Sequence, residues 1–170
     1  MERGEEQAAM KHVILGWGSL IWDKGDSALE LATGWSERGP ALPLEFSRVS
    51  DSRHGALTAV IDPANGVECP TRYAVSSRES IEDAICDLRS REGTVLRRVG
   101  FVDLVTGARR ASVHPAAADE LRRWAEEAGF ASVIWTDLPS NFEKAKRGPF
   151  SVGAAIQYLR DLENHRPEGA

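Results

Sequence analysis

An apolar run that ends in two closely spaced glycines is the feature that most constrains the fold of this chain. Residues 13–22 read VILGWGSLIW, so Gly16 and Gly18 follow a stretch of aliphatic and β-branched side chains. Such a run ended by glycine predicts a buried strand over residues 11–17 and then a sharp turn. Successive backbone N–H groups in a turn of this kind form a concave site for anions. We therefore expect the strand to lead into a receptor for a carboxylate or a phosphate.

The remaining predicted strands lie before and between the helices and do not alternate strictly with them. Strands are predicted over residues 42–49, 56–61, 69–75, 99–105, 109–113 and 131–135. A long loop over residues 23–43 contains one turn of helix over residues 27–32. Helices are predicted over residues 77–92, 117–128 and from Ser151 onward, and Ser76 with Glu79 forms a capping box for the first. This order favours the α+β class over a doubly wound sheet.

Length and composition indicate one globular domain. The chain has 170 residues, of which 42% are hydrophobic and 28% charged, enough to bury a core. We expect a single domain over residues 11–164, between a flexible tail over residues 1–10 and a loose tail over residues 165–170. The polar start lacks the apolar core of a signal peptide, and no apolar run is long enough to span a membrane.

Charge and cysteine content restrict the partners and the compartment. The net charge is −5 and no basic block stands out, so we expect no nucleic-acid partner. Cys69 and Cys86 do not form a Cys-x-x-Cys pair and are typical of a reduced, cytoplasmic protein. The sequence leaves the oligomeric state open.

Several common motifs are absent from the sequence. Gly16-x-Gly18 begins like a dinucleotide fingerprint, but Ile21 occupies the place of the third glycine. The chain has no phosphate-binding loop of the Walker type, no Gly-x-Ser-x-Gly elbow and no metal-ligand spacing. We therefore predict no nucleotide cofactor and no metal. The plain alternative for the two glycines is a tight corner without a ligand.

Glu92 is the second candidate for chemistry. It falls in the last turn of the predicted helix, directly before Gly93. The helix macrodipole favours cations at that end, and Arg89 and Arg91 offset the acidic charge there. Two interpretations stay open: a solvated glutamate at a helix end, or a carboxylate that burial prepares for proton transfer.

These two motifs resemble those of the γ-glutamylcyclotransferase-like superfamily. Trp17-Gly18-Ser19-Leu20 is similar to its Tyr-Gly-Ser-Leu loop, with Trp17 in place of the tyrosine. The helix end that contains Glu92 is similar to the Leu-Asp-x-x-Glu-Gly context of the catalytic glutamate, with arginine in place of the aspartate. The order of elements also fits over residues 11–142. The resemblance implies a divergent bacterial-type member, with a small mixed β-barrel, surrounding helices and a pocket at the barrel mouth.

The resemblance also implies a reaction. The α-amine of a small γ-glutamyl substrate attacks the side-chain carbonyl of the same molecule, which gives pyroglutamate and releases an amine. Glu92 would act as base and then as acid. The amides of Gly18, Ser19 and Leu20 would hold the α-carboxylate or the developing oxyanion. Trp17 would belong to the substrate-binding loop, and no metal or organic cofactor is needed.

Four further residues are candidates for the pocket. Trp22 flanks the loop and forms either a pocket wall or part of the core. Arg53 belongs to a polar cluster that either binds an acidic group or is a solvated loop. Asp137 and Asn141 follow a predicted strand and either reach the pocket or only form the turn.

Two other functions remain as alternatives. One is a non-catalytic binding domain for small carboxylates on the same fold, suggested by the departures from the motifs at Trp17 and Arg89. The other is an amidase with Ser19 as the nucleophile, although no histidine neighbours it in the sequence.

Overall fold

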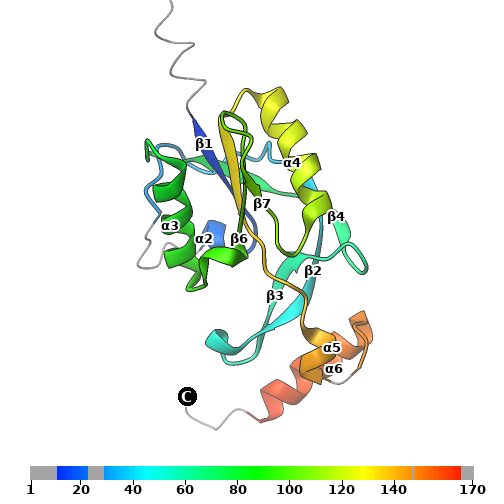
Figure 1. Ribbon diagram of the computed structural model, residues 1–170. Helices are drawn as coiled ribbons and strands as arrows, with labels where there is room; N and C mark the ends of the chain where they lie inside the picture. Colours follow the sequence, from blue (N-terminus) through cyan, green and yellow to red (C-terminus); the bar gives the residue numbers. More distant parts are fainter. Residues whose placement is uncertain (1–10, 23–28, 147, 166–170) are drawn as a thin grey trace, which may run out of the picture. The chain divides into compact units, whose positions relative to one another are not determined.

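The computed structural model describes residues 11–22, 29–146 and 148–165 (Figure 1). These residues form eight β-strands and five α-helices, which confirms the α+β class. The strands belong to a five-stranded and a three-stranded sheet. The chain divides into two compact units, the described parts of Met1–Leu42 with Cys69–Leu138, and of Pro43–Glu68 with Pro139–Ala170. The predicted tail over residues 1–10 and all but the first residue of the tail over residues 165–170 lie outside the described residues.

The first unit is built on the five-stranded sheet, whose order is β5-β1-β8-β6-β7. Its strands are β1 (His12–Gly16), β5 (Arg72–Val75), β6 (Val99–Asp103), β7 (Arg109–Arg110) and β8 (Ser132–Thr136). Strand β1 is parallel to β8 and antiparallel to β5, and β6 is antiparallel to β7 and β8. Therefore β1, β7 and β8 end where β5 and β6 begin. We call this end of the sheet, where β1 ends and β6 begins, its loop end.

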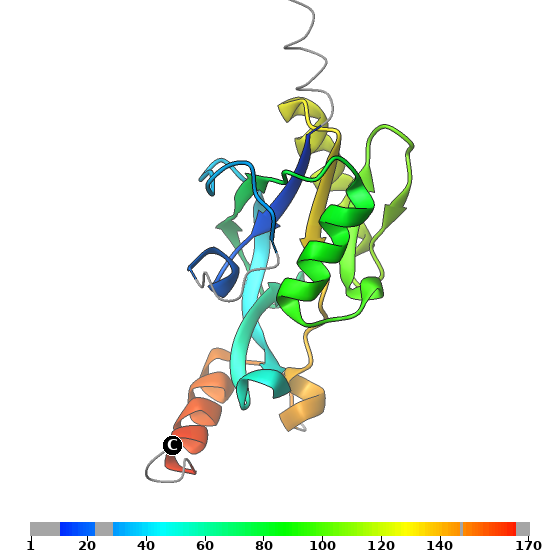
Figure 2. The same ribbon diagram turned by 90° about the vertical axis from the view of Figure 1, so that its left-hand side faces the viewer.

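Two helices cover opposite faces of this sheet, as Figures 1 and 2 show. Helix α3 (Ile81–Glu92) packs on one face and contributes Ile85 and Leu88 to a core cluster with Ile14 and Ile134. Helix α4 (Pro115–Ala128) buries Ala117, Ala118, Leu121 and Ala125. Because β1 lies between two strands and is covered by helices, all five of its residues are buried, which explains its continuous apolar run.

The start of helix α3 differs from the prediction. Its N-cap is Ser80, whose hydroxyl accepts a hydrogen bond from the amide of Asp83 (3.1 Å). Ser76 was predicted to be the cap, but its own amide donates to the carbonyl of His12 (2.9 Å). This pairing with β1 keeps Ser76 in extended chain. The C-terminal boundary is correct, because Gly93 adopts φ +61° and caps the helix.

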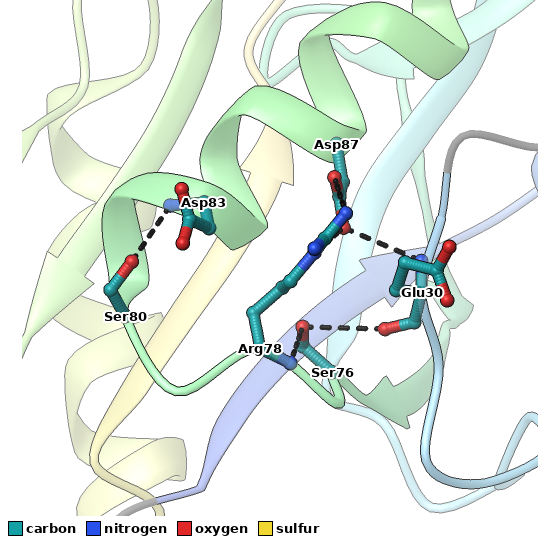
Figure 3. A network of polar contacts seen from close by, with 6 residues as sticks. All are labelled: Glu30, Ser76, Arg78, Ser80, Asp83 and Asp87. Atoms are coloured by element: carbon teal, nitrogen blue, oxygen red, sulfur yellow. Dashed lines mark hydrogen bonds and ion pairs between the residues drawn. The ribbon is translucent and has the colours of Figure 1, made fainter.

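An ion pair holds the chain beside α3 (Figure 3). Arg78 donates from two nitrogens to the two carboxylate oxygens of Asp87, at 2.9 and 3.0 Å. The Asp87 carboxylate raises the pKa of the Arg78 guanidinium. The amide of Glu30 also donates to Asp87 (3.4 Å), and the hydroxyl of Ser76 donates to the carbonyl of Glu30 (3.4 Å). Together these bonds attach the segment after residue 28 to the sheet and to α3.

The predicted helical turn over residues 27–32 is not present in its described part, residues 29–32. Leu31 instead forms an isolated bridge with Ser76, and Ser36 forms one with Tyr73. Residues 27 and 28 lie outside the described residues. These bridges to Ser76 and Tyr73 therefore hold the segment in an extended conformation in place of the predicted helical turn.

The second sheet has the order β3-β2-β4. Its strands are β2 (Ala41–Ser50), β3 (Ala56–Ile61) and β4 (Val67–Pro70), and the 3-10 helix Asp51–Arg53 follows β2. The predicted single strand over residues 69–75 is two strands in different sheets. The break lies at Thr71, whose hydroxyl donates to the carbonyl of Pro40 (2.6 Å). Contacts distant in sequence thus interrupt a run with uniform strand preference.

The helices of the second unit are α5 (Phe142–Lys146) and α6 (Val152–Asn164). The hydroxyl of Ser151 caps α6, as predicted, by accepting from the amide of Ala154 (3.0 Å). The core of this unit contains Val49, Phe142, Ala155 and Tyr158. Leu159 of α6 is 45% exposed and does not belong to this core. No helix of the described chain is long and apolar enough to cross a membrane.

Candidate functional site

The glycine loop starts at the loop end of the five-stranded sheet. Strand β1 ends at Gly16, and Gly18 adopts the left-handed conformation with φ +60°. The next four residues form the short helix α2 (Ser19–Trp22), and the amide of Ile21 donates to the carbonyl of Gly18 (3.1 Å). The sharp turn predicted after β1 is therefore present. The helical turn that follows it was not predicted, because four residues carry too little periodicity to indicate a helix.

Core contacts fix the position of this loop. Leu20 is 8% exposed and belongs to the same cluster as Leu88 of α3 and Val99 of β6. A Cβ atom at Gly16 would lie 2.6 Å from the indole ring of Trp35. The loop thus packs against the face of the sheet that α3 covers, and a side chain at Gly16 would prevent the close approach of Trp35.

Glu92 is the last residue of α3 and lies at the same end of the sheet. It follows Leu88 by four positions, so both side chains project from one side of the helix. The Glu92 side chain is only 17% exposed, its Oε1 atom is buried, and Arg91 Nη1 lies 4.0 Å from Oε1. This burial argues against the solvated helix-end glutamate. Helix α3 leads into the 3-10 helix Leu96–Arg98 and then into β6, which begins at the loop end.

Asp137 also lies at the loop end, directly after β8, and is fully buried. Its amide donates to the carbonyl of Arg98 (2.7 Å), and its Oδ2 accepts from the amide of Val113 (2.9 Å). Its Oδ1 has no hydrogen-bond partner within the described part of the chain. Asp137 therefore joins three segments of the first unit, a role beyond turn formation.

Trp22 ends α2 and is 72% exposed, so it is not part of the core. The guanidinium of Arg72 lies over its ring, 5.2 Å from the centroid. Arg72 is also the register partner of Gly16 across β1 and β5. Arg72 was not among the predicted site residues, because no local pattern in the sequence indicates which residue of β5 lies opposite the glycine loop.

Arg53 and Asn141 belong to the second unit. Arg53 is exposed at the end of its 3-10 helix. The side chain of Asn141 accepts from the amide of Val49 (2.7 Å) and donates to the carbonyl of Val49 (3.0 Å). This second unit contains a cavity of about 520 Å³, lined by residues that include Phe142, Tyr158 and Asp161. None of the predicted site residues lines that cavity.

The described residues include no group of three or more histidine, cysteine, aspartate or glutamate side chains that could hold a metal ion. Comparison with known proteins gives no match: no family model, no curated protein and no solved structure matches the chain. The site is thus defined by its geometry alone: a glycine loop and a largely buried glutamate at one end and on one face of a sheet in an α+β protein.

Proposed function

We propose that this chain is a γ-glutamylcyclotransferase-like enzyme, which cyclises a γ-glutamyl amide, amino acid or peptide to pyroglutamate and releases the amine. The observation that carries the proposal is the shared cluster of Leu20 and Leu88, which joins the glycine loop to the helix that ends in Glu92. The proposal includes the finer architecture of that superfamily, in which the strands close into a small barrel with the pocket at its mouth.

In the proposed reaction Glu92 transfers protons from the α-nitrogen to the leaving nitrogen. Its carboxylate takes a proton from the α-ammonium of the substrate, and the freed amine attacks the γ-carbonyl carbon. A new C–N bond closes a five-membered ring, and the carbonyl oxygen becomes an oxyanion. The protonated Glu92 then gives its proton to the leaving nitrogen as the original C–N bond breaks. The ring nitrogen loses its extra proton through the Glu92 carboxylate to the released amine, which departs as an ammonium ion. Ring closure is intramolecular, so holding the substrate in a reactive shape supplies much of the acceleration.

The glycine loop would orient the substrate. The amides of Gly18, Ser19 and Leu20 are suited to the α-carboxylate or the oxyanion, because backbone donors that are already in place need no reorganisation during the reaction. Trp17 is half-buried beside them and would bound the substrate. The reaction consists of proton transfers and a ring closure within one molecule, so no cofactor is part of it.

The test is pyroglutamate release from a panel of γ-glutamyl amines, amino acids and peptides, followed by mass spectrometry. Glu92→Gln should lower kcat by about 10²–10⁴-fold, because the amide cannot act as a base. Glu82→Gln is the matched control, since Glu82 is an exposed residue of the same helix. Turnover by Glu92→Gln close to that of the unmodified protein would remove Glu92 from the mechanism.

A binding domain without catalysis is the second candidate. Trp17 lacks the hydroxyl of the tyrosine that the superfamily has at this place, and Arg89 is exposed where it has an acidic residue. Saturable binding of a γ-glutamyl compound in calorimetry, with no pyroglutamate formed over hours, would favour this candidate.

A Ser19-dependent amidase has less support. His12, the histidine of β1, lies at the opposite end of that strand from the loop. Its ring nitrogens contact Ser132 Oγ (2.7 Å) and the carbonyl oxygen of Glu79 (3.1 Å). Retained activity in Ser19→Ala, without labelling of Ser19 by acylating reagents, would exclude this mechanism.

A further inference from the structure

Arg72 lies beside the glycine loop, on the face of the sheet that carries α3. It is the first residue of β5 and the register partner of Gly16, and side chains of paired residues project from the same face. On that face Gly16 meets Trp35, which packs against the cluster of Leu20 and Leu88. The Arg72 guanidinium is therefore a cation adjacent to the loop that would hold the substrate.

Trp22 orients this cation. The guanidinium carbon of Arg72 lies 5.2 Å from the centroid of the Trp22 ring. Stacking on an aromatic ring stabilises a guanidinium and restricts its plane, while its edge keeps a fork of donors that matches a carboxylate. Trp22 is also the last residue of α2, so one short helix connects Ser19 to the stacking partner of Arg72.

The structure already has a carboxylate on this guanidinium. Glu37 Oε1 lies 3.1 Å from Arg72 Nη2. The side chain of Glu37 is 80% exposed and that of Arg72 is 30% exposed. Exposed ion pairs contribute little to stability, so a substrate carboxylate can replace that of Glu37 at small cost.

We propose that Arg72 binds a carboxylate on the leaving group of the substrate, and that Glu37 occupies the same position when no substrate is bound. The substrate class is then γ-glutamyl amino acids and peptides with a free carboxylate, not γ-glutamyl amines. The reacting atoms must lie beside Glu92, whose side chain is 17% exposed. The side chain of Arg72 is 30% exposed and Trp22 is 72% exposed, so the leaving group would extend from Glu92 toward this more open pair. This inference rests on the proposed function and adds Arg72 as the residue that determines specificity for the leaving group.

The kinetic test compares γ-glutamylglycine with its C-terminal carboxamide. For the unmodified protein, KM should be about tenfold higher for the carboxamide than for the acid, at similar kcat. Loss of one charge-assisted hydrogen bond weakens binding by about this factor. Arg72→Met should raise KM for the acid about tenfold and leave KM for the carboxamide unchanged. Arg72→Lys should restore part of the difference, because it keeps the charge without the fork.

Two further variants sharpen this test. Glu37→Gln should lower KM for the acid alone, because it removes the competing carboxylate. Arg38→Met removes a neighbouring exposed charge and should change neither KM. Equal KM values for acid and carboxamide in the unmodified protein, or an equal effect of Arg72→Met on both, would overturn the inference.

A binding measurement separates this inference from the proposed function. If no pyroglutamate forms from any compound, the proposed function fails, and calorimetry with the same two compounds tests Arg72 directly. Binding of the acid about tenfold tighter than the carboxamide, abolished by Arg72→Met, would support the subsite. Equal binding of the two compounds, or binding of neither, would overturn it.

Discussion

Gly16, at the loop end of the sheet, has no space for a side chain. The ring of Trp35 fills the position that a Cβ atom of Gly16 would take, at 2.6 Å. Gly16→Ala should therefore lower the free energy of unfolding by about 1–3 kcal/mol, because overpacking forces the ring or the strand to move. Gly34→Ala is the control, since no atom lies within 4 Å of its Cβ position. Urea denaturation measures both, and equal stability of the two variants would contradict the argument.

Asp62 in the second unit carries a pH-dependent contribution to stability. Burial opposes its ionisation, but hydrogen bonds from Ser47, Asn65 and Ala64 outweigh burial and lower the pKa of the carboxyl below 3.8. A lowered pKa in the folded protein stabilises the fold above the unfolded value, and this stabilisation is lost as the pH falls through the folded value.

Asp62→Asn should therefore cost stability at pH 7, and its difference from the unmodified protein should narrow below pH 3.8. Urea denaturation at several pH values gives this difference. Asp119→Asn is a suitable control, because that carboxylate is 65% exposed. A difference that stays constant down to pH 2 would show that the Asp62 hydrogen bonds do not favour its charged form.

At the residue scale the sequence indicated the loop and Glu92, but not their surroundings. Gly18 and Leu20 could be predicted, because a glycine turn after an apolar run is a local signal. Arg72 and Glu37 could not, because their positions depend on strand register and on pairing across 35 residues. The sequence left open whether Trp22 lies in the core or in the wall of a pocket, since tryptophan occurs in both places.

At the scale of elements, the capping of α3 gives a sharp test. Ser80→Ala should lower the free energy of unfolding by about 1 kcal/mol, because the amide of Asp83 loses its hydrogen-bond acceptor. Ser77→Ala is the matched control, since the side chain of Ser77 is exposed. Thermal unfolding followed by circular dichroism compares them. A loss in Ser77→Ala as large as that in Ser80→Ala would contradict the assignment of Ser80 as the N-cap.

The sequence predicted correctly the ends of those elements that are stopped by turn residues or by a capping glycine. Strand β3 matches its prediction, because Asp62 and the residues after it stop the apolar run. Helix α4 ends at Ala128, as predicted, because Gly129 adopts a left-handed conformation and caps it. The split between β4 and β5 was not predictable, because the amide and the hydroxyl of Thr71 bind the carbonyl of Pro40, which lies 31 residues away in the sequence.

At the scale of the whole molecule, each of the two units has its own core. In the second unit the hydroxyl of Tyr158 donates to the carbonyl of Gly55, and burial together with Asp51 raises the pKa of Tyr158. The donor therefore stays protonated at neutral pH. Tyr158→Phe should cost about 1 kcal/mol and speed amide hydrogen exchange in residues 43–68 and 139–165.

Hydrogen exchange read by mass spectrometry separates the units. Leu88→Ala is the reciprocal variant, because Leu88 is fully buried in the core of the first unit and should speed exchange in β1, β8 and α3. Equal acceleration throughout the chain in both variants would mean that the two units unfold together.

The division into units was not visible in the sequence. The first unit combines the described parts of Met1–Leu42 with Cys69–Leu138, so the chain leaves it and returns. Composition does not change at these crossing points, and a single domain was the natural prediction from length. Contacts between distant segments, such as β1 with β8, define the first unit, and periodicity within a window does not detect them.

Gly18 adopts a left-handed backbone conformation, which D-amino acids prefer and L-amino acids avoid. Its φ is +60°, and no atom lies within 4 Å of the place where a Cβ atom would be. L-Alanine there would be strained, whereas its mirror image, D-alanine, prefers this backbone conformation. A chain assembled by chemical ligation with D-alanine at position 18 should keep the turn and have fewer unfolded conformations. Handedness, and not the space available, is therefore what favours glycine over the other natural amino acids at this position.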